Sequence, residues 1–388
     1  MDRKDVLCQN IGYLKKFERD LAYHFSEKTG YPYIEPHWVY VSLSHRCTYR
    51  CKMCGVVKIL QNYELTTERV KHVFDEIAQW RAKSEVVLTG GEPFLRKDIF
   101  DIIAYGIRKN IHIESVSNGA LIDQELAVKI MSCGLHNIAV SLDGVSPETH
   151  DAIRAKGSFD KAVNALRNLV QAKRRSGHGP QISVWTTIMN ENVTELYEMI
   201  ALVREVGVEC LVYHPVIVVQ ENMQNTLSDA PFWITKAKLE ILKTQIDKII
   251  EYQKKNGLVA FLHDPYLWLN YFEGNLKREQ WKCNPFVFIN IGPDGEVRSC
   301  GDSFGNIHKM SLSSCLRSED AYEARILMKT CAKPCLQTCW AHPDADSLSG
   351  IIKEFLDQLR HDAHNDKKTV LREALSMLNE YEEKLKQP

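Results

Sequence analysis

The segment WVYVSLSHRCTYRCKMC, residues 38–54, joins a predicted strand to a loop with three cysteines. Its first part, Trp38–Ser44, is rich in β-branched and aromatic residues, which favour a strand. Cys47, Cys51 and Cys54 follow directly, separated by three and two residues. Three thiolates cannot complete a four-iron cluster, in which each iron takes one cysteine, so such a cluster would keep one open iron. The alternative is a zinc site with His45 as the fourth ligand.

Beyond this segment, predicted strands alternate with amphipathic helices. The strand-like runs are Trp38–Ser44, Glu85–Thr89, Ile111–Ser117, Asn137–Leu142, Ile182–Met189 and Cys210–Ile217. The helical patterns are Thr67–Trp80, Ile99–Lys109, Asp123–Cys133, Phe159–Lys173 and Val193–Val206. Nearly continuous apolar strands separated by helices favour a parallel sheet that is covered on its outer face. Six such units predict an α/β fold with a partial (β/α)6 TIM-type barrel, and a doubly wound open sheet is the alternative.

The pattern changes after the sixth predicted strand. Trp233–Gln253 predicts one long helix, and Phe286–Ile291 with Glu296–Ser299 predicts a β-hairpin around a Pro-Asp-Gly turn. We therefore expect an N-terminal helical lead-in, the barrel, a connector helix, a small C-terminal α+β domain and a helical tail. In the same order, these parts are residues 1–35, 36–225, 226–260, 261–345 and 346–388.

Composition narrows the class of protein. The 388 residues include 49 Lys and Arg against 50 Asp and Glu, so the net charge is −1 and predicts no nucleic-acid partner. No apolar run approaches the ~20 residues of a membrane helix, and the first residues lack the pattern of a secretory signal. We therefore expect a cytoplasmic protein, in which clustered cysteines bind metal or carry out redox chemistry. No feature fixes the oligomeric state.

The cysteine spacing resembles the signature of the radical S-adenosylmethionine (SAM) enzymes, and the resemblance extends roughly from Val39 to Ile217. Motifs that resemble those of the family follow the predicted strands in order: Gly90-Gly91-Glu92-Pro93, Ser117-Asn118-Gly119, Ser141-Leu142-Asp143-Gly144, His150-Asp151-x2-Arg154 and Gly157-x-Phe159. The resemblance implies that SAM is bound by Met53, Gly90, Gly91, Glu92, Pro93, Asn118, Ser141, Asp143 and Arg154. Met53 would pack against adenine, the Gly-Gly-Glu-Pro segment would hold the amino group, and Ser141 and Arg154 would approach the ribose and carboxylate.

The same resemblance implies the chemistry. A [4Fe-4S] cluster on Cys47, Cys51 and Cys54 would chelate SAM through its open iron and cleave it reductively. The resulting 5′-deoxyadenosyl radical would abstract hydrogen from a substrate, leading to oxidation, epimerisation or rearrangement. A flavodoxin- or ferredoxin-type donor would supply the electron. The sequence assigns no catalytic acid or base, and His214 at the end of the sixth strand is either a substrate-side residue or a packed histidine.

A second group of cysteines resembles the C-terminal SPASM or twitch domains of this superfamily. Six cysteines lie beyond residue 280, fewer than the eight that two fully ligated four-iron clusters need. We therefore expect one auxiliary [4Fe-4S] cluster for electron transfer, held by Cys283, Cys300 and two of Cys331, Cys335 and Cys339. Cys315 would be a spare residue in a polar loop. A four-cysteine zinc site is the alternative.

The substrate class is left open by the motifs. The first 35 residues are few for a module that recognises a leader peptide, which favours a small or carrier-borne substrate. A peptide-modifying radical SAM enzyme is the first alternative. A non-catalytic iron–sulfur or zinc protein is the second, although it gives no reason for the Gly-Gly-Glu-Pro segment or for an open iron.

Overall fold

The computed structural model describes residues 3–58, 61–81, 83–217, 230–261, 264–277, 280, 285–331, 335–336, 347–361 and 367–386. The strands are β1 Trp38–Ser42, β2 Glu85–Thr89, β3 His112–Ser117, β4 Asn137–Ser141, β5 Gln181–Ile188, β6 Cys210–Pro215, β7 Val259–Phe261, β8 Phe288–Ile291, β9 Glu296–Ser299 and β10 Asp302–Asn306. The helices are α1 Arg3–Thr29, α2 Thr67–Ile77, α3 Ile99–Arg108, α4 Gln124–Ser132, α5 Pro147–Ile153, α6 Ser158–Ser176, α7 Glu198–Val206, α8 Leu239–Asn256, α9 Leu267–Glu273, α10 Leu312–Leu316, α11 Glu319–Thr330, α12 Leu348–His361 and α13 Lys367–Lys386. Short 3-10 helices lie at Gly55–Lys58, Pro93–Leu95 and Lys236–Lys238.

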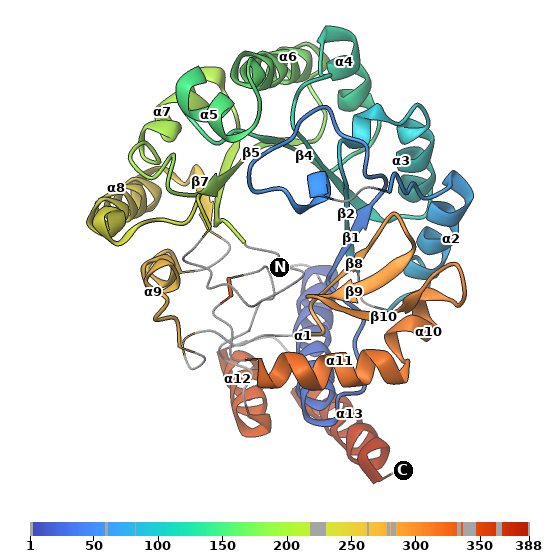
Figure 1. The fold of residues 1–388 in the computed structure, drawn as a ribbon. Coiled ribbons are helices and arrows are strands. Elements are labelled where there is room, and N and C mark those ends of the chain that lie inside the picture. The colour runs from blue at the N-terminus through green and yellow to red at the C-terminus, as the bar shows by residue number, and fades with distance from the viewer. Residues whose placement is uncertain are drawn as a thin grey trace.

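One curved sheet organises the molecule. Its strand order is β10-β9-β8-β1-β2-β3-β4-β5-β6-β7, and neighbours from β8 through β1 to β7 are parallel. Helices α2 to α8 lie outside this curve (Figure 1). A doubly wound sheet reverses its strand order at a switch point, whereas β1 to β7 follow each other without reversal. The prediction of a partial TIM-type barrel is therefore confirmed.

The two faces of the barrel strands differ. Val39 and Val41 of β1 are fully buried in the main core, whereas the alternating residues Trp38 and Tyr40 are half-buried. On β3, Ile113 faces the helices, because a Cβ at Gly106 of α3 would lie only 2.3 Å from its Cδ1 atom. Side chains alternate along a strand, so the residues on either side of Ile113 face the concave interior.

Two predicted helices begin later than expected. α7 begins at Glu198 instead of Val193, because the Asn192 side chain bonds the backbone N–H of Met189 and the carbonyl of Thr187 and so fixes a turn before the helix. α8 begins at Leu239 instead of Trp233. Trp233 is buried, and its indole donates to the Phe272 carbonyl at 2.9 Å. Trp233 therefore lies in the core and not in the connector helix, which begins later than predicted.

The predicted hairpin is present, but it belongs to the same sheet as the barrel. β8 pairs parallel to β1, and β9 and β10 continue the sheet in antiparallel fashion. Gly295 has a φ of +84° in the turn between β8 and β9, a conformation that favours glycine. The C-terminal segment is therefore attached to the barrel through backbone hydrogen bonds.

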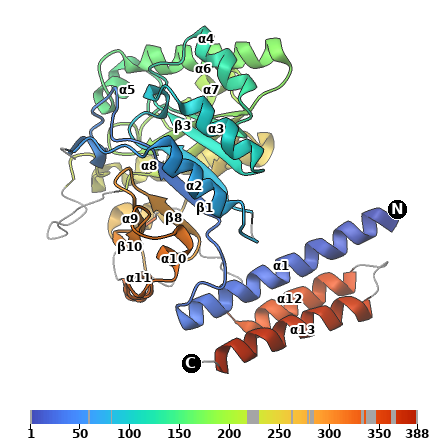
Figure 2. The ribbon, with the colours of Figure 1, turned by 90° about the vertical axis from the view of Figure 1, so that its right-hand side faces the viewer.

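The N-terminal helix and the two C-terminal helices pack against one another beside the barrel (Figure 2). Phe17 of α1 lies 4.4 Å from Phe355 of α12, measured between ring centroids, and Phe25 stacks on Tyr381 of α13 at 5.0 Å. The predicted lead-in and tail thus share one small core, while the proposed domain boundaries stay predictions. No helix in the described ranges has the length and apolarity to cross a bilayer.

Candidate functional site

The three-cysteine loop is held directly against the end of β2. The N–H groups of Gly91 and Glu92 donate to the carbonyls of Ser44 and Arg46 at 2.7 and 2.8 Å. A Cβ at Gly91 would lie 2.0 Å from the Arg46 carbonyl oxygen, and one at Gly90 would lie 2.6 Å from that of Ser44. Only glycine permits this approach, so the glycine pair fixes the position of the cysteine loop.

Polar groups from the loop itself and from the ends of β3 and α5 reach the sulfurs. The Tyr49 N–H and the Asn118 side-chain amide donate to Cys47 Sγ at 3.5 and 3.6 Å. The Arg154 guanidinium approaches Cys51 Sγ, with Nη1 at 4.0 Å. Donors and a positive charge around sulfur stabilise thiolates and the negative charge of a metal–thiolate centre.

Burial and charge act in opposite directions on these thiols. Burial raises the pKa of Cys51 to about 11 and raises that of Cys47 above its ordinary value. The Arg154 guanidinium acts against this rise at Cys51. Because metals bind the thiolate, Arg154 favours the ligand form of Cys51.

The positions of the sulfurs fit a multi-iron cluster better than zinc. Zinc holds sulfur ligands at about 2.3 Å, which places all of them within about 4 Å of one another. The Sγ atoms of Cys47, Cys51 and Cys54 do not all lie within 4.8 Å of one another. His45, the fourth ligand of the zinc alternative, has its Nδ1 2.9 Å from the Gln61 carbonyl. The donor set therefore suits a [4Fe-4S] cluster, whose cysteines bind separate irons.

Glu92 joins the ends of two strands. Its carboxylate is buried and accepts hydrogen bonds from Ser117 Oγ at 2.9 Å and from the Asn118 N–H at 2.8 Å. A longer bond comes from the Phe94 N–H at 3.3 Å. Burial raises the pKa of Glu92, and these hydrogen bonds act in the opposite direction. Glu92 therefore places the Asn118 side chain beside Cys47, in addition to the SAM contact that the sequence predicts.

Asp143 holds Arg154 in place. Its fully buried carboxylate accepts from Arg154 Nε at 2.5 Å and from the Thr187 N–H at 2.8 Å. Its own N–H donates to His150 Nδ1 at 3.0 Å. Both carboxylate oxygens are thus occupied by the protein, and Asp143 is a positioning residue for Arg154.

The remaining predicted cofactor residues lie at the same edge of the barrel. Ser141 is the last residue of β4 and is buried, Met53 is half-buried against the main core, and Pro93 begins the 3-10 helix after β2. All nine predicted SAM contacts lie at or just after the carboxyl ends of β1 to β4 or, for Arg154, at the end of α5. The contacts to SAM themselves stay predictions.

Two further features lie at this edge. An ion pair of 3.3 Å joins Lys52 in the cysteine loop to Glu191 after β5. His214 Nε2 lies 3.4 Å from Thr187 Oγ1, and burial lowers the pKa of His214. No sequence signal marks Lys52, Glu191 or Thr187, because their partners are distant along the chain.

The second cysteine group is described only in part. Cys300 is exposed, with a φ of +59°, between β9 and β10, and Cys331 follows α11. Burial raises the pKa of Tyr271, and the nearby Cys335 acts in the same direction. The Tyr271 hydroxyl donates to the Val216 carbonyl after β6. Cys335 is therefore near the carboxyl end of a barrel strand.

Two cysteines of the predicted auxiliary set, Cys283 and Cys339, lie outside the described residues. Cys315 is fully buried in α10, where a Cβ at Gly305 would approach its sulfur to 3.3 Å. The prediction of a polar loop around Cys315 is wrong, since its small apolar side chain fills the core between α10 and β10.

Comparison with known proteins agrees with this geometry. Residues 41–203 match the family model described as the radical SAM superfamily. The AdoMet-dependent heme synthase of Methanosarcina barkeri is 31% identical over 46% of this chain and 50% of its own length. The mycofactocin maturase MftC of Mycolicibacterium smegmatis is 33% identical over 43% of this chain and 42% of its own. The chain thus spans about half the length of these curated relatives.

A solved structure shares the fold over most of the chain. The structure of native anSMEcpe with bound AdoMet and Cp18Cys peptide has a TM-score of 0.60 and 15% sequence identity, and the match covers 88% of this chain and 99% of that one. At this identity the likeness shows the fold alone. The family match contains the cysteine loop and the segments that follow β2 to β5. Residues 41–203 of this chain therefore match a radical SAM domain.

Proposed function

We propose that this chain is an enzyme that uses SAM and a [4Fe-4S] cluster to abstract hydrogen from a substrate. The observation that carries the proposal is the placement of Cys47, Cys51 and Cys54 at the mouth of the barrel, with Asn118 and Arg154 directed at two of their sulfurs. When bound, the cluster and SAM supply a reductive cleavage that yields the 5′-deoxyadenosyl radical. A flavodoxin- or ferredoxin-type donor in the cytoplasm would provide the electron.

The residues of the chain orient and shield this chemistry. Cys47, Cys51 and Cys54 would hold three irons, and the fourth would be left for SAM. Gly90 and Gly91 fix the loop, Asp143 fixes Arg154, and Arg154 supplies positive charge beside Cys51. Positive charge at this point favours both the thiolate and an anionic carboxylate of SAM.

We further propose one auxiliary [4Fe-4S] cluster in the C-terminal segment, for electron transfer. Cys283 and Cys300 would contribute along with two of Cys331, Cys335 and Cys339. Its support is the position of Cys335 near Tyr271, which hydrogen bonds to the segment after β6. A cluster there would lie on the side of the barrel strands where the cysteine loop is found.

For the substrate we propose a small or carrier-borne molecule, in line with the match to a heme synthase. A peptide is the second candidate. Two observations favour it: MftC is named as a maturase of mycofactocin, and the solved structure with the same fold contains a peptide. Turnover assays with a porphyrin and with a peptide bearing a cysteine, both followed by mass spectrometry, distinguish the two candidates.

The test is SAM cleavage by anaerobically reconstituted protein. With dithionite, wild-type protein should form 5′-deoxyadenosine, and Cys51→Ala should form none above background. Cys133→Ala is the matched control, because Cys133 lies in the turn after α4. An inactive wild-type protein that carries zinc in place of iron would refute the proposal. About eight irons per chain are expected from two four-iron clusters, and about twelve would refute a single auxiliary cluster.

A further inference from the structure

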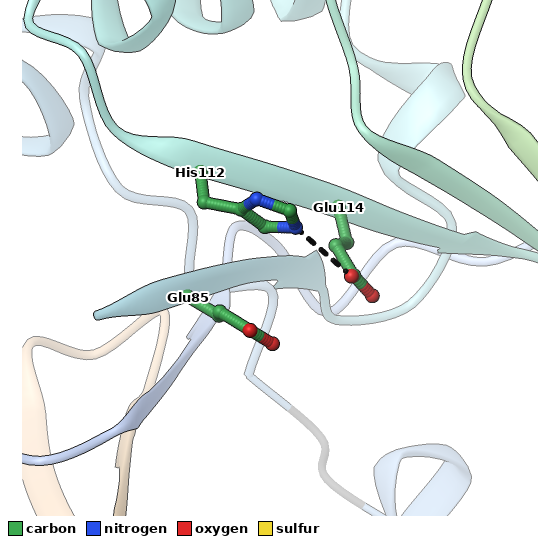
Figure 3. A group of neighbouring side chains, drawn as sticks. All are labelled: Glu85, His112 and Glu114. Carbon is green, nitrogen blue, oxygen red and sulfur yellow. Dashed lines mark hydrogen bonds and ion pairs between the residues drawn. The ribbon is translucent and has the colours of Figure 1, made fainter. Parts of the chain in front are cut away.

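A second group of metal-ligand side chains lies at the opposite end of the barrel from the cysteines. Glu85 and His112 are the first residues of β2 and β3, and they are direct partners in the register of these parallel strands. Glu114 follows two residues after His112 on the same face. Figure 3 shows the ion pair between His112 and Glu114, with Glu85 on the neighbouring strand beside them. The cysteine loop lies at the other ends of these strands, about 13 Å away along a five-residue strand.

The donor atoms are close enough for a single metal ion. One ligand atom from each of Glu85, His112 and Glu114 lies within 4.8 Å of the other two. Ligands bound at 2.0–2.2 Å lie within about 4.3 Å of one another, so small rotations bring all three to bonding distance. His37 can supply a fourth ligand, because its Nε2 lies 3.7 Å from Glu85 Oε1.

Hydrogen bonds from outside the group orient both carboxylates. The Trp38 indole N–H donates to Glu85 Oε2 at 2.9 Å, and the Asn137 amide donates to Glu114 Oε2 at 3.2 Å. Each carboxylate therefore keeps its Oε1 atom directed at an imidazole, Glu85 towards His37 and Glu114 towards His112. Such outer hydrogen bonds are what fix the ligands of protein metal sites.

A neighbouring histidine orients the His112 ring. His136 stacks on His112 at 3.9 Å between ring centroids and holds the plane of that ring. Its Nδ1 accepts from the Ile113 N–H, which fixes His136 in turn.

We propose that Glu85, His112 and Glu114, with His37 as a fourth ligand, form a binding site for a divalent first-row transition metal ion at the floor of the barrel. Two carboxylates and neutral imidazoles supply a −2 donor set of nitrogen and oxygen, which suits Mn²⁺, Fe²⁺, Co²⁺ or Zn²⁺. All four side chains are partly exposed, between 21% and 43%, so an ion can enter. An ion bound here would link the segment before β1 to strands β2 and β3. It is independent of the cysteine loop and of the proposed function.

Mn²⁺ is the probe of choice, because it prefers oxygen and nitrogen over thiolate ligands. The full-length protein, with its iron–sulfur clusters reconstituted and loose metal removed by chelation, is titrated with Mn²⁺. Free Mn²⁺ is measured by its six-line electron paramagnetic resonance signal. We expect one Mn²⁺ to bind per chain and Zn²⁺ to displace it. Glu85→Gln and His112→Asn should each weaken binding at least about tenfold, and Trp38→Phe should weaken it less.

Glu68→Gln and His308→Asn are the matched controls, because both residues are exposed and lie elsewhere. Both controls should bind Mn²⁺ as the wild type does. Circular dichroism and the thermal midpoint check that each variant is folded. Saturating Zn²⁺ should raise the thermal midpoint of the wild type and of both controls but not that of Glu85→Gln. Absence of stoichiometric binding, or binding unchanged in folded Glu85→Gln and His112→Asn, would overturn the proposal.

Discussion

The two cysteine groups of this chain are built in different ways. The first lies within eight residues, and its loop is fixed by backbone hydrogen bonds to the end of β2 and by side chains from the ends of β3 and α5. The second is spread from Cys283 to Cys339 over a hairpin and a helix, and Cys300 is exposed in a turn of left-handed backbone. In the first group the barrel itself holds the ligand loop in place.

This difference has a consequence for the two proposed clusters. A loop that is packed against neighbouring strands keeps its geometry when one ligand is lost, whereas ligands on separate elements depend more on the metal to bring them together. We therefore expect the first centre to be sensitive to packing around its loop and the second to depend on its individual cysteines. Four measurements test this expectation, from the largest effect to the smallest.

The largest effect is expected from Gly91→Ala. Its Cβ would overlap the Arg46 carbonyl, so the cysteine loop must move away from β2. SAM cleavage should fall at least about 100-fold, because displacements of 1 Å near a reacting centre have costs of this size. Gly55→Ala, beside the same loop, is the control, because a Cβ there meets no atom within 4 Å. Equal activity of both variants would show that the loop is not fixed by its packing.

Cys300→Ala tests the second group. Loss of one ligand should remove the auxiliary cluster and lower the iron content from about eight to about four per chain, with the SAM-binding cluster retained. Cys210→Ala, in β6, should leave the iron content unchanged. If Cys300→Ala keeps all its iron, Cys300 is not a cluster ligand.

Asp143→Asn tests the ion pair that positions Arg154 beside Cys51 of the first group. The substitution leaves the Arg154 guanidinium, which is 9% exposed, without its buried carboxylate partner. Breaking such a pair costs about 3 kcal/mol of stability, to be measured by chemical denaturation. Asp101→Asn, at an exposed position of α3, should cost little. A similar small cost for Asp143→Asn would show that the ion pair does not stabilise this edge.

The smallest effect concerns His150, which accepts a hydrogen bond from the Asp143 N–H. Burial lowers the pKa of His150 to about 4, from an ordinary value near 6.5. Between these values the unfolded chain binds a proton that the folded chain does not, so stability falls as the pH falls below 6.5. The wild type should lose about 1 kcal/mol from this group between pH 7.5 and pH 5.5. His150→Asn should reduce this pH dependence, and an unchanged profile would contradict the assignment.

The sequence predicts most of the barrel and little of its supporting network. Glu85–Thr89 is both a predicted and an observed strand, because local apolar pattern and flanking turns mark it. The contact of Thr187 with Asp143 and the pair Lys52–Glu191 join residues 44 and 139 positions apart, and no local pattern records them. Similarly, Trp233 has a helical pattern but is taken into the core by its contact with Phe272.

In the candidate site too, the sequence predicts some residues but not the contacts that position them. Spacing alone marks Cys47, Cys51 and Cys54, and the resemblance marks Gly90 and Gly91 as SAM-binding residues. Their close packing on the cysteine loop depends on the three-dimensional approach of two backbone segments. The floor of the barrel gives no sequence signal either, because Glu85 and His112 become neighbours only through strand register.

The central claim is that the three-cysteine loop leaves one iron open to SAM. Electron–nuclear double resonance on the reduced Cys300→Ala variant, in which only the first cluster should persist, measures this directly. With SAM labelled by ¹⁷O in the carboxylate and ¹⁵N in the amino group, we predict hyperfine coupling of both nuclei to the cluster. A cluster signal that SAM leaves unchanged, with no coupling to either label, would contradict the claim.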